Sequence, residues 1–443
     1  MRRGGTRTNI LGRPLTAEER RASQRNYGRF CLVNGVSYMC LGENVLVLFA
    51  ARLETPDTIV AILGSMLYVG FVMLPLGVRR TARLGAAISL ADFWFARNLA
   101  ALLTAAAAPV ALASPRMAWG LLLLGSLLFY GCRAAGCVIG TPLVGDISTE
   151  QEAPVVLGDT QALYNASSAV MLVVITLLTA RWHGLWTLAG IIVFGACCGV
   201  WASGFLRRIW ESGAICDAAM VPLLPGMRAA WRNRNLHRLA AAWSAFNVCL
   251  MLTVPMSMLA LKRGCGLGDA AALLCACAQF VSGYVVSRQS GGLCQSRGTR
   301  RVLLLTAAGF FIVPALWLAM PSGGMPAVAV GVLLFSLLGS LTVLVYNAAS
   351  AHFLLVCPDK REQIAASVAI NLVSGAGAGL AGSAIGPWLI AHAVGWAPRL
   401  AAFGSGAIGT YRLYFLTLIP ILAFAVAASQ SLTSRVVKKN HPC

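Results

Sequence analysis

Charged residues are scarce in this chain. Only 11% of its 443 residues are charged and only 15 are acidic, whereas soluble domains are about a quarter charged. Hydrophobic residues make up 58% of the sequence, and the mean hydropathy is +0.75. This composition excludes an ordinary soluble protein and indicates a polytopic membrane protein.

Enzyme motifs are also lacking. The sequence contains no phosphate-binding loop, no His-Glu-x-x-His pair and no nucleophile elbow. We therefore expect neither an ATP-driven pump nor an enzyme, and no cofactor. The first 29 residues are rich in Arg and contain no apolar stretch, so we expect no cleavable signal peptide.

The 14 cysteines do not indicate disulfides or a metal site. Most lie inside apolar runs. The pair Cys275-Ala-Cys277 has neither a second pair nor a nearby His. Buried cysteines that behave as small apolar residues explain this pattern better, and we expect no metal.

Long apolar runs dominate the rest of the chain. Runs of about twenty apolar residues are long enough to cross a bilayer as helices. Twelve such spans are predicted, near residues 30–52, 58–77, 88–112, 117–144, 161–180, 185–206, 239–261, 270–287, 302–320, 327–349, 364–393 and 411–430.

The basic residues predict the orientation of these spans. The net charge is +20, which in a soluble protein would suggest nucleic acid. Here the basic residues fall in short gaps between apolar spans, and 26 of the 35 lie on the side that holds both termini. The positive-inside rule places that side in the cytoplasm. We therefore expect no nucleic-acid partner. We expect a multi-pass protein of a lipid bilayer, with the bacterial inner membrane as its predicted location.

The longest internal loop divides the spans six and six. The predicted units are a basic cytoplasmic tail (1–29), an N-terminal six-helix bundle (30–206), a cytoplasmic linker (207–238), a C-terminal six-helix bundle (239–430) and a second tail (431–443). The linker carries the basic cluster Arg228, Arg232 and Arg234. An amphipathic segment at anionic headgroups fits it better than a folded domain does.

One loop carries a recognisable pattern. Residues 291–301 read Gly-Gly-Leu-Cys-Gln-Ser-Arg-Gly-Thr-Arg-Arg. This resembles the loop signature of the major facilitator superfamily, Gly-x-x-x-Asp-Arg-x-Gly-Arg-Arg. The matching residues are Gly291, Gly298, Arg300 and Arg301, while Gln295 replaces the acid.

The loop after the second span resembles the same signature more weakly. Gly77, Arg83 and Gly85 match in part, and Ala82 stands where the acid belongs. Both loops lie between the second and third span of a six-span half, which is the internal repeat of such transporters. The resemblance implies an all-α membrane protein with twelve transmembrane helices in two six-helix halves. It also implies that these loops change partners as the protein changes state.

Glu43 is an acid within the first apolar span. An ionisable residue at that depth costs about 2.5–3.5 kcal/mol on insertion scales, so it indicates a functional site. Arg133 in the fourth span lies at a similar depth, roughly 17 Å against roughly 20 Å at 1.5 Å per residue. In the family that the chain resembles, an Arg in this span followed by glycines is associated with proton coupling. The resemblance also implies that the first and fourth spans line a common cavity, where Glu43 and Arg133 would pair.

Two readings of this pair remain open. It is either a permanent structural ion pair or a switch that responds to a proton or a substrate. Asp92 and Arg97 in the third span are predicted to lie near the cytoplasmic interface, as anchors or in contact with the preceding loop, with substrate contact as the alternative. Neutral polar side chains complete the candidate substrate site: Asn34, Tyr38, Asn165, Asn247, Gln279, Asn347 and Asn371. Each alone is more often a helix–helix hydrogen bond than a ligand.

The sequence therefore predicts a secondary transporter that moves a small polar solute by alternating access. A sugar and a small organic acid are the two predicted solute classes. Proton coupling, uniport and exchange all remain open, and a monomer is expected. The alternatives are a multidrug or metabolite exporter of the same fold and a membrane receptor or scaffold that does not transport.

Overall fold

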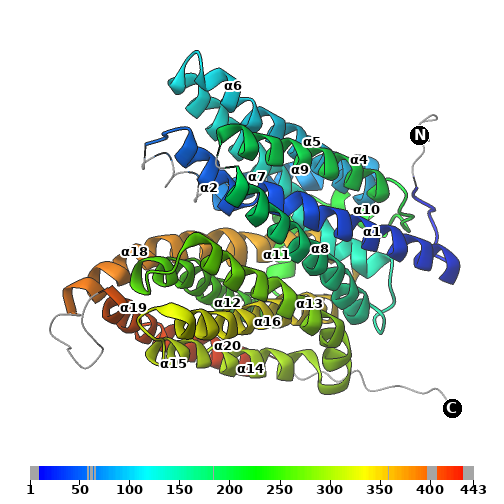
Figure 1. Cartoon of the computed structure of the whole chain (residues 1–443). Helices are drawn as coiled ribbons and strands as arrows, with labels where there is room; N and C mark the ends of the chain where they lie inside the picture. The colour runs from blue at the N-terminus through cyan, green and yellow to red at the C-terminus, as the bar shows by residue number, and fades with distance from the viewer. Residues whose placement is uncertain are drawn as a thin grey trace.

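The computed structural model describes residues 9–56, 59, 63, 66–182, 184–357, 359–396 and 407–432. Within these ranges it leaves undescribed the side chains of a few helical residues, including Glu43 and Asn44. The described residues are almost entirely helical and form no strand longer than the single bridge between Ile10 and Glu211. The helices form two bundles joined by the linker (Figure 1).

The N-terminal bundle occupies the upper part of Figure 1. It consists of α1 (Ala17–Leu41), α2 (Glu43–Arg52), the 3-10 turn η1 (Gly70–Met73), α4 (Leu74–Leu84), α5 (Ala86–Ala105), α6 (Ala107–Ala111), α7 (Pro115–Asp146), α8 (Ala153–Arg181) and α9 (Leu185–Leu206).

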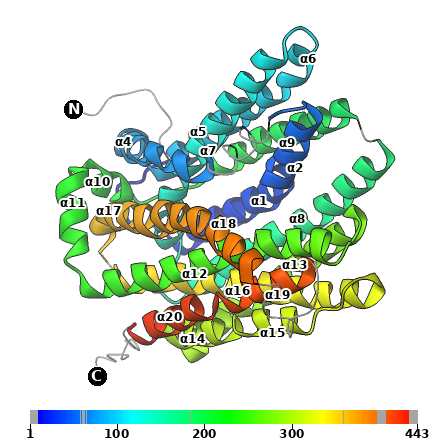
Figure 2. The same cartoon turned by 90° about the vertical axis from the view of Figure 1, so that its left-hand side faces the viewer.

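The linker contains two short helices, α10 (Ala214–Met220) and α11 (Leu223–Trp231). Figure 2 shows them beside α4 and α17 at one end of the molecule, here called the linker end. Ile215, Ala218 and Ala219 of α10 are buried, and α10 packs on α4 and α17. The linker therefore packs against helix ends of both halves through α10, and contact of its exposed basic cluster with anionic headgroups stays a prediction.

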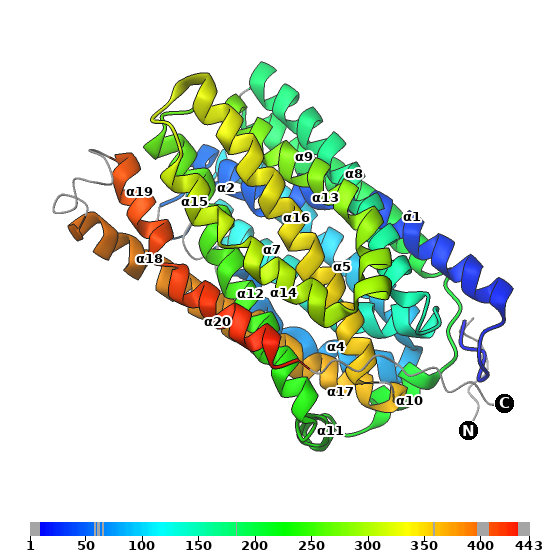
Figure 3. The same ribbon diagram turned by 90° about the horizontal axis from the view of Figure 1, so that it is seen from below.

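The C-terminal bundle lies nearer the viewer in Figure 3. It consists of α12 (Arg234–Leu259), the π-helical turn η2 (Ala260–Gly264), α13 (Asp269–Arg297), α14 (Thr299–Gly309), α15 (Ile312–Leu318), α16 (Gly324–Val356), α17 (Lys360–Ile370), the π-helical turn η3 (Asn371–Gly377), α18 (Ala378–Trp396), α19 (Ala407–Leu416) and α20 (Ile419–Gln430).

Within the described residues, nine helices are long and apolar enough to cross a membrane. The predicted span 58–77 lies partly outside the described residues. The predicted span 270–287 is the helix α13, which carries polar residues such as Gln279 and Ser287 along its length. The fold class is confirmed, and the count of twelve spans stays a prediction.

The first predicted span is broken. The helix α1 begins at Ala17, well before the predicted start at residue 30, because Thr16 caps it in a capping box with Glu19. It ends at Leu41, and Gly42 takes an extended conformation (φ −67°, ψ 165°) before α2 begins at Glu43. The expected continuous helix is therefore two helices, and Glu43 opens the second.

Small residues bring the two halves together in the middle of the molecule. A Cβ on Gly379 would lie 2.0 Å from a ring atom of Tyr68, and one on Gly375 would lie 2.7 Å from the ring of Phe71. Tyr68 and Phe71 belong to the N-terminal half, whereas both glycines lie in the C-terminal half. The glycine-rich stretch of 375–379 thus allows side chains of one half to pack against the backbone of the other.

Candidate functional site

Arg133 lies in the middle of α7 and is half-buried. Its Cζ lies 5.2 Å from the ring centroid of Tyr38 on α1, which is within cation–π range. The ring of Tyr38 is in turn 6.1 Å from the ring of Tyr164 on α8. Three helices of the N-terminal half therefore meet around this guanidinium.

Arg97 of α5 is buried as well, with 1% of its surface exposed. Its Cζ lies 4.8 Å from the ring of Trp94 and 5.1 Å from the ring of Phe129. One terminal nitrogen donates to Asn34 Oδ1 at 2.9 Å, and Nε is buried without a hydrogen-bond partner. The prediction that Arg97 lies at the interface is wrong, because eleven residues of rise from Ala86 place it about 16 Å along α5.

Asn34 of α1 connects this helix to α5. Its Oδ1 also accepts a hydrogen bond from Trp94 Nε1 at 2.8 Å. Asn34 and Tyr38 lie four residues apart on α1 and therefore share one helix face. Arg97, Arg133, Asn34, Tyr38 and Tyr164 are called the arginine cluster below.

The arginine cluster carries two positive charges within electrostatic range of each other. Among the described residues, no carboxylate lies within ion-pair distance of either guanidinium. The side chain of Glu43 lies outside the described part of the chain, so its pairing with Arg133 stays a prediction. Two like charges in a low-dielectric interior repel each other and attract an anion.

Two predicted amides of the C-terminal half make hydrogen bonds within that half. Asn247 on α12 donates to the backbone oxygen of Ser374 at 2.6 Å. Asn371, the first residue of η3, donates to the backbone oxygen of Ser367 at 2.8 Å. Both amide nitrogens are thus engaged in the protein's own structure.

The other three predicted amides cluster around α13. Asn165 of α8 donates to Ser287 Oγ at 3.2 Å, which joins the two halves. Asn347 of α16 donates to Ser290 Oγ at 2.7 Å, and its Oδ1 is buried without a partner. Gln279 is half-buried on α13, where its backbone passes Gly339. The structure therefore does not bring these amides into the arginine cluster.

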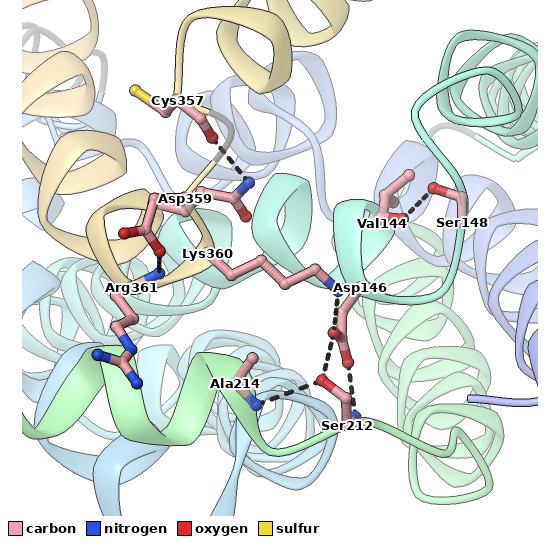
Figure 4. A network of polar contacts seen from close by, with 10 residues as sticks. Val144, Asp146, Ser148, Ser212, Ala214, Cys357, Asp359, Lys360 and Arg361 are labelled. Carbon is pink, nitrogen blue, oxygen red and sulfur yellow. Dashed lines mark hydrogen bonds and ion pairs between the residues drawn. The ribbon is translucent and has the colours of Figure 1, made fainter. Parts of the chain in front are cut away.

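A second site closes the linker end of the molecule. Asp146, the last residue of α7, has a fully buried carboxylate. It accepts hydrogen bonds from the backbone N–H of Ser212 at 2.7 Å and from the Ser212 hydroxyl at 2.6 Å. The Lys360 ammonium at the start of α17 donates to it at 2.6 Å. Figure 4 shows both partners converging on Asp146, which thereby joins the N-terminal half, the linker and the C-terminal half.

Close backbone packing reinforces this closure. A Cβ on Gly291 would lie 2.7 Å from the backbone oxygen of Pro154, and one on Gly158 would lie 2.7 Å from that of Ser287. Gln295 donates from its amide to the backbone oxygen of Gln151. The start of α8 and the C-terminal part of α13 are thus in close backbone contact. Together with the Asp146 network, these contacts are called the linker-end gate below.

The two glycine-rich segments are mostly helical and not extended loops. Helix α4 continues through Gly77 and Arg83 as far as Leu84, and α13 continues through Gly291 to Arg297. Only Gly85 (φ 84°) and Gly298 (φ 80°) leave the helical conformation, each immediately before the next helix. Both turns therefore use the left-handed region that favours glycine.

The remaining residues of these segments are placed as follows. Gly77 packs against α7, where a Cβ would lie 2.1 Å from the backbone oxygen of Ala135. Arg300 donates to the backbone oxygen of Gln430 at 2.8 Å. Arg83 and Arg301 are exposed. Of the sequence-predicted segment residues, Gly291 and Gln295 take part in the linker-end gate.

The sequence did not indicate a role for Glu211. It is fully buried, and its carboxylate accepts hydrogen bonds from the backbone N–H of Ala86 at 2.8 Å and of Ala87 at 3.3 Å. An acid at this position satisfies the free N–H groups at the start of α5. Burial raises the pKa of Glu211 to about 7, although the two backbone donors act in the opposite direction.

The third-span acid does contact the preceding segment. Asp92 accepts hydrogen bonds from Arg80 of α4 and, at 2.6 Å, from Arg207 at the end of α9. Both arginines are half-exposed, so these bonds hold helix ends together at the surface. In the described part of the chain, no group of three His, Cys, Asp or Glu side chains could hold a metal ion.

Comparison with known proteins identifies the fold. No protein-family description matches the sequence, and no curated protein matches it. Solved structures do match, and the chain has the fold of the major facilitator superfamily of transporters. A bacterial homologue of the iron transporter ferroportin in an outward-facing state matches with a TM-score of 0.66 at 12% identity, over 92% of this chain and 99% of that one.

Two further solved structures give the same result. The proton:xylose symporter XylE, bound to 6-bromo-6-deoxy-D-glucose, matches with a TM-score of 0.63 at 12% identity, over 93% of this chain and 96% of that one. The human organic anion transporter MFSD10 matches with a TM-score of 0.62 at 12% identity, over 92% and 99%. At such identities the likeness concerns the fold.

Proposed function

We propose that this chain is a secondary transporter that moves a small organic anion across the membrane by alternating access. The observation that carries the proposal is the arginine cluster. Two guanidinium groups lie inside the N-terminal half, and neither has a carboxylate partner among the described residues. A solute carboxylate would supply the missing negative charge, and Arg binds carboxylates through two parallel hydrogen bonds.

The amides favour an anion over a sugar. A sugar requires several free donors and acceptors around its hydroxyl groups. Asn165, Asn247, Asn347 and Asn371 already donate to protein oxygens. The arginine cluster holds an unpaired donor, the buried Nε of Arg97, whereas the unpaired atom of Asn347 is an acceptor.

The linker-end gate supports alternating access. The positive-inside rule assigns the linker end to the cytoplasm. The gate holds that end closed through polar contacts between the two halves, and such contacts can separate and re-form as the halves rock. Asp146 and Lys360 contribute its ion pair.

Uptake by the reconstituted protein tests the proposed solute class. Purified protein in liposomes is offered radiolabelled mono- and dicarboxylates and neutral sugars, with and without a pH gradient. We expect saturable uptake of a carboxylate, and Arg133→Gln should lower it at least tenfold because the charge is lost. Arg116→Gln provides a matched control, since Arg116 lies in the first turn of the same helix and is exposed. Saturable sugar uptake without anion uptake would contradict the proposal.

Proton coupling through Glu43 is tested in the same liposomes. If Glu43 takes up the proton, Glu43→Gln should abolish uptake driven by a pH gradient and leave solute exchange intact. Unchanged gradient-driven uptake would exclude this role of Glu43. Uptake by the unchanged protein that does not respond to the pH gradient would instead indicate a uniporter or an exchanger.

A further inference from the structure

A groove runs between the first half of α1 and the start of α8. Its volume is about 1010 Å³. The two helices lie side by side in Figures 1 and 3. The groove is separate from the arginine cluster and belongs to the linker end. Its lining includes Arg21, Arg25, Arg29, Leu32 and Leu163.

Three arginines form one wall of the groove. Arg21, Arg25 and Arg29 follow one another at intervals of four residues, so they lie on one face of α1. All three are exposed, whereas Ser23 and Phe30 on the opposite face are buried. Their side chains make no hydrogen bond or ion pair with another described residue. Three adjacent positive charges without a partner in the described part of the chain favour an anionic ligand.

The acids of the groove do not neutralise this wall. Asp159 of α8 has its own cation, because Arg288 of α13 lies 3.6 Å from it. Glu18 lies in the first turn of α1, at the outer end of the groove. The groove therefore has three positive charges against one acid without an ion pair, Glu18.

The groove changes from charged to apolar along its length. Leu32 follows Arg29 by three residues on α1, and Leu163 follows Asp159 by four residues on α8. Leu32 is 41% exposed and Leu163 is 36% exposed. The distance from Arg21 to Leu32 along the helix is about 16 Å, which covers a headgroup layer and the beginning of the hydrocarbon. A ligand that fits has an anionic head and an apolar tail.

We propose that this groove binds a phospholipid with an anionic headgroup. The phosphate accepts hydrogen bonds from Arg21, Arg25 and Arg29, and the acyl chains lie along Leu32 and Leu163. Guanidinium groups suit phosphate because they donate two parallel hydrogen bonds to it. Anionic lipids are enriched on the cytoplasmic side, to which the positive-inside rule assigns this end.

Native mass spectrometry of the full chain in detergent tests this site. The protein is titrated with phosphatidylglycerol, phosphatidylcholine or inorganic phosphate. We expect phosphatidylglycerol to bind at least tenfold more tightly than phosphatidylcholine. The triple variant Arg21→Gln, Arg25→Gln, Arg29→Gln should lose this preference.

A second triple variant, Arg83→Gln, Arg297→Gln, Arg301→Gln, controls for bulk charge. It removes three charges from exposed positions at the ends of α4 and α13 and at the start of α14, and it should change phosphatidylglycerol binding less than twofold. Equal losses in both variants would overturn the proposal. So would equal binding of the two lipids, or displacement of phosphatidylglycerol by millimolar inorganic phosphate, which would indicate a site for free phosphate. If the first triple variant does not fold, Arg25→Gln alone should weaken binding at least threefold, and an unchanged affinity would overturn the proposal equally.

Discussion

Lys360 makes the one ion pair of the Asp146 network, and replacing it with methionine tests whether this network holds the linker end closed. The ammonium lies 2.6 Å from a carboxylate that is fully buried, while the lysine side chain itself is 39% exposed. The substitution leaves Asp146 with its two hydrogen bonds from Ser212 but without a counter-charge. The pair joins the two halves, so the open state that alternating access requires would lack it.

The expected effect follows from the burial of the two partners. A hydrogen bond to a charged group contributes about 1.5–3 kcal/mol, and the exposure of Lys360 reduces this through solvent screening. A loss of about 1–2 kcal/mol from the closed state corresponds to a shift of about 5–30-fold toward the open state. The neighbouring Arg361→Met is the control, because Arg361 is exposed and only its backbone N–H bonds to Asp359.

Hydrogen–deuterium exchange measured by mass spectrometry reports this shift without cysteine labelling. Peptides that cover the end of α7 and the start of α17 should exchange faster in Lys360→Met than in the unchanged protein or in Arg361→Met. Adding Lys360→Met to Asp146→Asn should have a much smaller effect than Lys360→Met alone, because no buried charge is left. Equal exchange rates in Lys360→Met and Arg361→Met would refute the reasoning. So would effects of Lys360→Met and Asp146→Asn that are fully additive in the double variant.

Two further predictions concern the start of α5. Gly85→Ala should lower the thermal unfolding temperature, because a φ of 84° strains alanine and the new Cβ would lie 2.2 Å from Glu211 Oε1. The control Gly120→Ala should leave that temperature unchanged, because Gly120 is helical and its Cβ would have nothing within 4 Å. Glu211 is expected to make the stability of the fold depend on pH. Its pKa is about 7 in the folded state, against 4.5 ordinarily. Between these two pH values the folded state binds more protons than the unfolded state, so the fold loses stability as pH rises from 4.5 to 7. Thermal unfolding from pH 4.5 to 8 should show this loss in the unchanged protein and a smaller one in Glu211→Gln; parallel profiles would contradict it.

Much of the fold was predictable because apolar length and basic asymmetry are local properties of the sequence. The break at Gly42 was not, because glycine within a membrane span is common and its backbone conformation depends on neighbouring helices. Arg97 was placed wrongly for a related reason. Aromatic neighbours such as Trp94 suggest an interfacial belt, yet here they stack on a guanidinium in the interior.

The amides show the opposite limit of sequence reasoning. Composition identifies Asn165 and Asn347 as unusual in apolar spans, but only the packed structure shows what they contact. Each donates to a serine of α13, Ser287 or Ser290. Because α13 packs against both α8 and α16, these bonds place the polar helix at the junction of the halves. A polar residue in these two spans therefore indicated an interhelical contact.

At the turn after the second span, an acid from a distant part of the sequence lies next to the segment that lacks one. Ala82 stands where the acid of the loop signature is expected. Glu211 lies more than 120 residues later, yet its carboxylate reaches the turn at Gly85 and bonds to Ala86 and Ala87. The backbone of Glu211 also pairs with Asn9 and Leu11. An acid on the linker thereby ties the start of α5 to both the linker and the N-terminal segment.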